Sequence, residues 1–599
     1  MKNIFNGKKQ GLVLIIIGFC LLVIGAALAA CAPHQVKASS STSMSSLPTA
    51  ISGVVVDANG SVLSGAIVQI KGTPNKTTTA KDGSFSLSGE GLGGTKLVTL
   101  TAWSTGHFVG WADLDPQKPV WQEGGKGIKI TLKPLYTTDN NNYTWFEYEG
   151  LTGSASCVMC HFDGIEWQKD AHSQSAQNIR FITMYTGSNV QGQIGQQTAY
   201  TSDGKAAPID PNQPYFGPGY KLDNPQRTGN CAACHTPLAS TVSNQKNCSW
   251  MGCHTSFTVD NSKKVIDPEV NPVSLIGTAA EGITCEFCHK IKDVTLDPKT
   301  NLPYPDMPGI LSLKLSRPST GQQVFYGTIV DVNRRVSYLP LETQSQFCAA
   351  CHYGVFGGVV GDGEVTGGTV IYNSYGEWLN SPYSNPKTGK TCQDCHMPVE
   401  PGVHAIVYPE KGGITRGYIT INNHTMPGAS DESLLKSAVT MKSSASHTGN
   451  QLVVNVSITN DKTGHDVPTD APQRSVMLVV QAVDANGKQL ALIQGPALPA
   501  WTGNYSGQPG KAFAKILRDD MSGETPTAAY WRPVTLIEDT RLAPFATDAS
   551  NYTFALPDGQ LAEVKVTLVY RREFQKLAQE KGYNDPDIKM AEDIIHVEK

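Results

Sequence analysis

Cysteine and histidine carry the chemistry that stands out in this sequence. Two of the fourteen cysteines lie near the N-terminus, and the other twelve form six pairs, each followed at once by a histidine. The paired residues are Cys157, Cys160, Cys231, Cys234, Cys248, Cys253, Cys285, Cys288, Cys348, Cys351, Cys392 and Cys395. Thiolates and imidazoles bind metals, and thiols can also form disulfides or bonds to a cofactor.

Five of the six pairs have the spacing C-x-x-C-H, and the sixth, Cys248 to Cys253, has four intervening residues. C-x-x-C-H is the attachment signature of c-type haem, in which two thiols bond to the porphyrin and the adjacent imidazole reaches the iron. The proximal histidines would be His161, His235, His254, His289, His352 and His396. The sequence therefore predicts six haem c groups and six irons.

Two other interpretations of the pairs are weaker. A zinc site would join two cysteine pairs and would not require a histidine after each one. A disulfide across two residues would close a small, strained ring and would leave the histidines unexplained. The disulfide alternative is more serious for the wider Cys248–Cys253 pair.

Eight histidines remain after the six proximal ones, and some of them are candidates for the sixth iron ligand. The distal candidates are His172, His424, His465 and His404, with His107 and His447 as weaker candidates in the flanking regions. His172 follows Trp167 on a helix predicted over 165–177, whereas His424 and His465 lie in loops framed by Gly and Pro. Met184, Met307 and Met426 are possible thioether ligands, although an isolated Met more often serves packing.

Two longer patterns resemble known cytochromes. Tyr148-Glu-Gly-x-x-Gly-Ser-x-x-Cys157, followed by Trp167 and His172, resembles the opening of the tetrahaem cytochrome family that accepts electrons from hydroxylamine oxidation. That family usually has Ser where Asp170 stands. Gly464-His465-x-x-Pro468-Thr469 also recurs in multihaem c-type cytochromes. The resemblance covers roughly 150–599 and implies haem c, extracytoplasmic electron transfer and largely bis-histidine irons.

The N-terminus predicts export and a lipid anchor. A basic start is followed by an apolar stretch over 11–30. The end of this stretch together with the next residue, Leu28-Ala29-Ala30-Cys31, resembles a bacterial lipobox. Acyl chains on Cys31 would hold the protein to a bacterial membrane. The alternative is an uncleaved transmembrane anchor, since the stretch is nearly long enough to span. Both place the protein outside the cytoplasm, and we expect the cell surface.

Composition and periodicity predict a fold that is mainly β and irregular, within the α+β class. Gly (58) and Pro (36) are frequent, which favours strands and loops over long helices. We expect a signal peptide over 1–30, a tether over 31–50 and a β-sandwich over 51–135 that resembles the carboxypeptidase regulatory-like domain. A loop-rich, haem-packed domain with few helices follows over 136–430. A second β-sandwich with a terminal helix, over 571–581, would occupy 431–599.

These features predict an electron carrier that passes electrons along closely spaced haems. A multihaem oxidoreductase acting on a small nitrogen compound is the alternative, because one open iron would suffice for it. The net charge of −4 excludes a nucleic-acid partner, since phosphate binding requires a basic surface. The expected partners are the membrane, other redox proteins or extracellular electron acceptors; self-assembly stays open.

Overall fold

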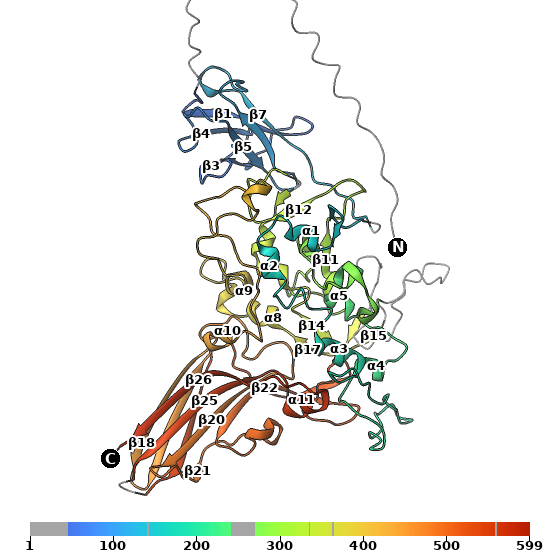
Figure 1. Cartoon of the computed structure of the whole chain (residues 1–599), viewed down its shortest axis with the longest axis vertical. Coiled ribbons are helices and arrows are strands. Elements are labelled where there is room, and N and C mark those ends of the chain that lie inside the picture. The colour runs from blue at the N-terminus through green and yellow to red at the C-terminus, as the bar shows by residue number, and fades with distance from the viewer. Residues whose placement is uncertain are drawn as a thin grey trace, which may run out of the picture. The chain divides into compact units, whose positions relative to one another are not determined.

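The computed structural model describes residues 46–140, 143–240, 270–334, 336–361, 364–557 and 560–598. The leader, Cys31 and the motif of Cys248, Cys253 and His254 lie outside these residues, so the predictions for them stay predictions. Within the described ranges, no helix combines the length and apolar character needed to cross a membrane. Strands and irregular segments predominate and helices are short, in agreement with the predicted β-rich, irregular class (Figure 1).

The N-terminal region, blue in Figure 1, contains two small sheets that share one core. The first has the order β4-β1-β7, with β1 (Ala50–Asp57), β4 (Ser84–Ser88) and β7 (Ile128–Leu132). The second has the order β3-β2-β5-β6, with β2 (Ile67–Ile70), β3 (Lys76–Thr78), β5 (Val98–Trp103) and β6 (Gly110–Leu114). Alternate residues of β4 and β7 are buried, as expected for strands with one solvated face.

The turn sequence Asp57-Ala-Asn59-Gly60 predicts a hairpin between strands over 51–56 and 66–70, and this hairpin does not form. The turn after Asp57 is present, because the Asp57 N–H donates to Ser61 O at 2.8 Å. Strand β1, however, pairs with β4 on one edge and with β7 on the other, so neither edge is left for β2. Strand β2 pairs instead with β3 and β5 in the second sheet.

The central region is a succession of short elements. Its helices are α1 (Ala155–Val158), α2 (Asp163–Trp167), α3 (Ile179–Thr186), α4 (Tyr220–Asp223), α5 (Ala232–His235), α6 (Pro237–Ser240), α7 (Cys285–Cys288), α8 (Ser374–Leu379) and α9 (Cys392–His396). Its strands form two-stranded pairs: β8 (Glu147–Tyr148) with β9 (Leu151–Thr152), β10 (Ile291–Val294) with β11 (Leu313–Leu315), β12 (Phe325–Gly327) with β13 (Val336–Tyr338), β14 (Gly354–Phe356) with β17 (Thr369–Tyr372), and β15 (Val359–Gly361) with β16 (Glu364–Thr366).

The helix predicted over 165–177 is much shorter than expected. Helix α2 ends at Trp167, and a series of turns carries the chain to Asn178, whose side chain caps α3. The Ser173 hydroxyl donates to Asp170 O at 2.8 Å within these turns. Ser and Asp bond to nearby backbone in this way and so compete with helix formation. His172 therefore lies on a turn.

The C-terminal region has two larger sheets. One has the order β18-β19-β24-β21, with β18 (Thr440–Thr448), β19 (Gln451–Thr459), β21 (Leu492–Gln494) and β24 (Thr547–Ala555). The other has the order β23-β22-β20-β25-β26, with β20 (Ser475–Asp484), β22 (Gly510–Asp519), β23 (Val534–Asp539), β25 (Ala562–Arg571) and β26 (Ile588–Val597). Both sheets contribute side chains to one apolar core, which includes Val454, Tyr552, Val480 and Leu568.

Two helices accompany these sheets, α10 (Glu432–Ser437) and α11 (Gln575–Lys581). The predicted closing helix thus begins four residues later than expected and ends at Lys581 as predicted, where Gly582 caps it in the left-handed conformation that favours glycine. It is not the last element, because β26 follows it and pairs with β25 along its length.

The predicted boundary at 430–431 does not separate two independent cores. Ala529 and Trp531, from the C-terminal sequence, pack in one cluster with Met184 and Tyr185. The Arg532 guanidinium donates to both carboxylate oxygens of Asp223 at 2.6 and 2.7 Å. The segment around 528–532 therefore belongs by its contacts to the central region.

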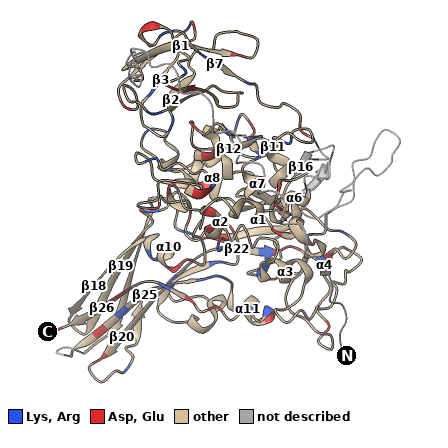
Figure 2. Cartoon of the chain, turned by 45° about the horizontal axis from the view of Figure 1, so that its top comes forward, with Lys and Arg blue, Asp and Glu red and all other residues tan. Residues whose placement is uncertain are grey.

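Outside this contact, charged residues are interspersed along the chain, as Figure 2 shows.

Candidate haem sites

Each of the five described C-x-x-C-H motifs lies on a single helical turn. The histidine N–H donates to the carbonyl of the first cysteine in four of them: His161 to Cys157 at 3.0 Å, His235 to Cys231 at 2.9 Å, His289 to Cys285 at 3.1 Å and His352 to Cys348 at 3.2 Å. The fifth motif forms α9 itself, with a capping box between Thr391 and Asp394. Residues three and four apart share one face of such a turn, so each motif brings two thiols and an imidazole together.

The ten described motif cysteines are partly buried. Thiols of different motifs also approach one another. A hydrogen bond with Cys285, together with burial, raises the pKa of Cys157. Hydrogen bonds with Cys351 and with Cys392 likewise raise the pKa of Cys234 and of Cys348. The fold thus joins motifs that are far apart in the sequence.

The proximal histidines of three motifs are held by backbone carbonyls. The Nδ1 atoms of His235, His289 and His396 lie 2.9, 2.8 and 2.7 Å from the carbonyls of Ser175, Tyr326 and Pro427. A carbonyl only accepts, so each Nδ1 carries the proton and each Nε2 keeps its lone pair. Metal-ligating histidines are oriented in this way, and the residues present therefore fit an imidazole-ligated iron.

Carboxylates lie beside two of the proximal imidazoles. His352 Nδ1 is 3.4 Å from Asp470 Oδ2, and His289 Nδ1 is 3.3 Å from Glu342 Oε1. Burial opposes the charge on His352, yet the contact with Asp470 raises the pKa of His352 to about 9. For His161, by contrast, burial and His289 lower the pKa to about 4. The proximal imidazoles therefore have electrostatically different surroundings.

Two of the distal candidates lie opposite proximal histidines. The ring centres of His172 and His352 are 6.1 Å apart, and those of His465 and His396 are 6.3 Å apart. Metal–imidazole bonds of about 2 Å, with about 1.1 Å more from each Nε2 to its ring centre, give a separation of about 6 Å. Both separations therefore match two imidazoles that share one metal.

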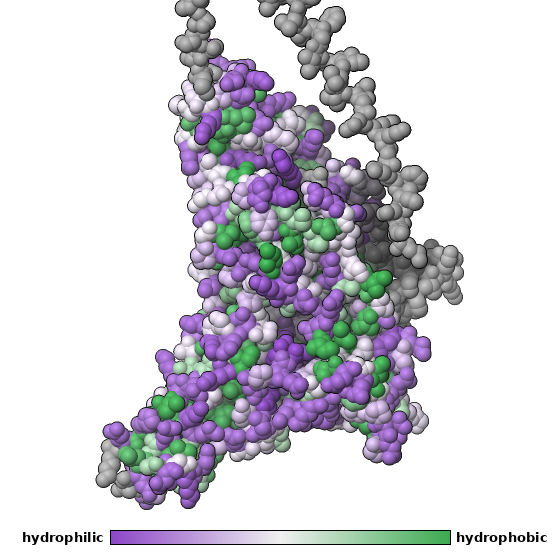
Figure 3. All heavy atoms as spheres, in the orientation of Figure 1, coloured by the Kyte–Doolittle hydropathy of each residue, from purple (hydrophilic) through white to green (hydrophobic). Residues whose placement is uncertain are grey.

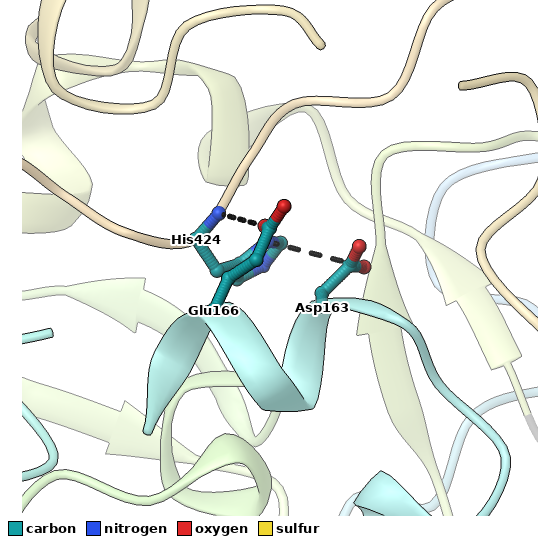
Figure 4. Close-up of side chains that lie close together, drawn as sticks. All are labelled: Asp163, Glu166 and His424. Atoms are coloured by element: carbon teal, nitrogen blue, oxygen red, sulfur yellow. Dashed lines mark hydrogen bonds and ion pairs between the residues drawn. The ribbon is translucent and has the colours of Figure 1, made fainter. Parts of the chain in front are cut away.

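His424 lies beside two carboxylates of α2, as Figure 4 shows. Its Nδ1 is 3.9 Å from Asp163 Oδ2, and its backbone N–H donates to Glu166 Oε2 at 2.7 Å. Burial and Glu166 raise the pKa of Asp163 to about 7, while burial lowers the pKa of His424 to about 4. Ligand atoms of the three residues lie close enough to hold one metal ion. Their arrangement equally suits a histidine that ligates iron through Nε2 with Asp163 behind it.

The other candidates differ in how their rings are held. His404 Nδ1 bonds to Ile419 O, and the segment after it pairs with the first motif through a bridge between Val407 and His161. His107 bonds through Nδ1 to Thr105 O in the N-terminal region. His447 on β18 uses Nε2, which lies 3.4 Å from Leu556 O. The nitrogen that His447 would need for iron is therefore engaged elsewhere.

Sequence reasoning missed the acidic partners of the imidazoles. Asp470 is 118 residues from His352, and no spacing rule connects the two. One signal was available: Asp470 follows the Gly464-His465-x-x-Pro468-Thr469 pattern directly. In the structure Asp470 has φ of 59°, an uncommon left-handed conformation that Asp tolerates better than most residues.

Apolar side chains are exposed around the motifs. Met159, inside the first motif, and Ile165 on α2 are 38% and 48% exposed. Figure 3 shows hydrophobic residues gathered in patches among hydrophilic ones on the face drawn. Met159 and Ile165 therefore offer apolar side chains to a macrocycle held at the first motif.

Comparison with solved structures gives several partial similarities, two of which are as follows. The chain is similar to the crystal structure of a penta-haem cytochrome c552 from Thermochromatium tepidum, with 20% identity and a TM-score of 0.47 over 74% of this chain and 98% of that one. It is also similar to the ASH/PapD-like domain of human CEP192, with 9% identity and a TM-score of 0.12 over 29% of this chain and 89% of that one. Both TM-scores lie below 0.5, so neither similarity supports an inference about this chain. No family model and no curated protein matches it.

Proposed function

We propose that this protein is an extracytoplasmic multihaem cytochrome c that carries electrons along six covalently bound haems. The observation that carries the proposal is the backbone carbonyl that lies beside Nδ1 of three motif imidazoles. Acceptors on Nδ1 of His235, His289 and His396 leave each Nε2 free to bind iron. When bound, haem c supplies an iron that takes up and gives up one electron.

The protein's own residues hold, orient and enclose these groups. The two thiols of each motif fix the position of the macrocycle, and the adjacent histidine binds from one side. His172, His424, His465 and His404 are the proposed ligands of the other side. Thiol contacts such as Cys234 with Cys351 support short distances between neighbouring motifs. Closely spaced sites favour electron transfer without moving parts.

The flanking regions would present this conduit at the cell surface. We assign both as β-sandwiches, because in each region two sheets contribute to one apolar core. Cys31 would carry the lipid that anchors the chain, with other redox proteins or extracellular acceptors as partners. Replacing Cys31 with Ser should leave an unlipidated protein that is retained or shed. Wild-type processing and membrane fractionation in the Cys31→Ser variant would instead favour the transmembrane alternative.

A haem count combined with spin states tests the central claim. The intact mass in denaturant should show six covalent haem additions, confirmed by a pyridine haemochrome assay. EPR of the oxidised protein should show low-spin signals only, with the four named histidines closing four irons to substrates and other strong ligands closing the remaining two. A high-spin signal would favour the oxidoreductase alternative. A haem count of zero would overturn both functions, and a count of five would remove the wide Cys248–Cys253 motif.

A further inference from the structure

We propose that His352 and His172 bind the haem attached at Cys348 and Cys351, and that buried Asp470 and Asp170 give it a lower reduction potential than the haem bound by His396 and His465. This inference rests on the proposed function. It concerns two carboxylates that act on the iron through its imidazole ligands, which makes them positioning residues. The two imidazole pairs, His172 with His352 and His396 with His465, have nearly equal ring-centre separations of 6.1 and 6.3 Å.

Both imidazoles of the first pair face a carboxylate. His172 Nδ1 lies 2.9 Å from Asp170 Oδ2, and the Asp170 side chain is fully buried. Asp170 Oδ1 is buried without a hydrogen-bond partner among the described residues. Among the described residues, the side-chain hydrogen bond of the Asp170 carboxylate is therefore the one to His172.

Asp470 is held in place on the other side. Its Oδ1 accepts from the N–H groups of Asn373 and Ser374 at 3.0 and 2.9 Å. Its Oδ2 accepts from the Ser374 hydroxyl at 3.1 Å and faces His352 Nδ1 at 3.4 Å. Arg474 acts on Asp470 electrostatically but donates its hydrogen bond to Thr469 O. A carboxylate with this many fixed donors stays ionised beside the imidazole.

The second pair has neutral partners in the same positions. His396 Nδ1 lies 2.7 Å from Pro427 O, and His465 Nδ1 lies 3.0 Å from Asp466 O. Both partners are backbone carbonyls. The Asp466 carboxylate itself pairs with Arg541 at 2.8 Å, which offsets its charge. The two pairs thus differ mainly in what accepts the Nδ1 proton.

That difference decides which of the two haems has the lower reduction potential. A carboxylate that accepts the Nδ1–H makes the imidazole a stronger donor to a metal bound at Nε2. Stronger donation and nearby negative charge both favour the ferric over the ferrous state, so the potential falls. Two carboxylates act on the first pair and none acts in this way on the second. Asp170 also stands where the resembling cytochrome family usually has Ser, which cannot supply the charge.

Redox titration of the whole protein with Asp170→Asn, Asp470→Asn and the double variant tests the inference. Asn keeps the size of Asp but removes the charge. We expect one redox component to shift upward in each variant and further in the double one, with the haem count and the low-spin count unchanged. Asp394→Asn, on the motif of His396 but away from its imidazole, is the matched control and should leave that component in place.

Spectroscopy identifies which iron has shifted. The imidazole planes of the first pair cross at 67° and those of the second at 18°, and crossed planes give the more anisotropic low-spin EPR signal. His172→Ala should convert that anisotropic signal to a high-spin one. Redox components that all stay in place in the double variant, an equal shift in Asp394→Asn, or an unchanged signal in His172→Ala would overturn the inference. A protein without covalent haem would overturn the proposed function instead.

Discussion

The C-terminal β-region and the central region obtain their interiors in different ways. In the C-terminal region, two sheets fill one continuous core with aliphatic and aromatic side chains. In the central region, the apolar clusters are small, and each joins only a few short elements. Charged side chains such as Lys290, Asp331 and Arg416 are buried there instead. Asp331 and Arg416 bind each other at 2.6 Å.

This difference indicates what the central sequence lacks. Short helices and two-stranded sheets cannot bury enough apolar area to stabilise themselves. Motif thiols such as those of Cys231, Cys288 and Cys351 pack against these small clusters. A large apolar cofactor at each motif would supply the missing interior. The C-terminal region requires no such contribution, because its own strands complete its core.

The largest expected effect comes from preventing haem attachment. In the full chain with the motif cysteines replaced by Ser, we expect the central region to lose its protection against proteases. The C-terminal region should persist as a resistant fragment, because its core contains no motif residue. Limited proteolysis with mass mapping of the fragments measures this. Equal digestion of both regions, or a haem-free central region as resistant as the haem-loaded one, would contradict the claim that haem supplies the interior of the central region.

The next effect concerns a buried ion network that ties the two regions together. Arg532 binds Asp223 and also Asp519 Oδ2 at 2.6 Å, and all three side chains are buried or nearly so. Arg532→Met should cost about 3–5 kcal/mol of stability, because it leaves two buried carboxylates without their cation. Urea unfolding followed by circular dichroism measures the loss.

The exposed pair of Arg518 and Asp520 provides the matched control for that substitution. Its side chains are 47% and 35% exposed, so Arg518→Met should change stability by only about 0–1 kcal/mol. Equal losses in Arg532→Met and Arg518→Met would mean that burial of the network contributes nothing.

A core substitution tests the C-terminal region by itself. Leu568 on β25 is fully buried between the two sheets, and Leu568→Ala should cost about 2–5 kcal/mol through lost burial and the cavity left behind. The haem spectrum should not change. Leu561, which is half exposed, is the control, and Leu561→Ala should stay within about 0.5 kcal/mol. A spectral change in Leu568→Ala would show that the two interiors are coupled.

The sequence predicts some strands of the two flanking regions well and misses others. Period-two alternation predicts a strand over 128–132, which are the observed bounds of β7, and a strand over 563–570, which falls one residue short of β25 at each end. It missed β18, whose residues are mostly Ser, Thr and Lys, because pairing with β19 rather than an apolar pattern holds that strand. Alternation reports a buried face, so strands with little buried surface escape it.

The residues of the candidate sites also differ in how far the sequence predicts them. Each C-x-x-C-H motif is local, so its two thiols and its imidazole could be predicted from spacing alone. The pairing of His172 with His352, and of His465 with His396, depends on tertiary contacts that no local pattern encodes. The carboxylates on His172 and His352 are further from prediction still, because an Asp in a loop looks like any solvated residue.

The smallest effect lies where α11 meets the central region. Lys581 is fully buried, and its Nζ lies 3.1, 3.2 and 2.7 Å from the carbonyl oxygens of Thr183, Ser188 and Pro218, to all three of which only a charged ammonium could donate. Burial lowers the pKa of Lys581 to about 7, from 10.5 in an unfolded chain. Between these values the unfolded state binds a proton that the folded state lacks, so folding stability rises with pH by at most about 1.4 kcal/mol per unit. Unfolding titrations from pH 7 to 9 should show this rise in the wild type and lose it in Lys581→Met, while the same change at exposed Lys589 should preserve it. A wild type and a Lys581→Met variant with parallel pH profiles would show that the lysine stays charged among its three carbonyls and that α11 is docked by those hydrogen bonds alone.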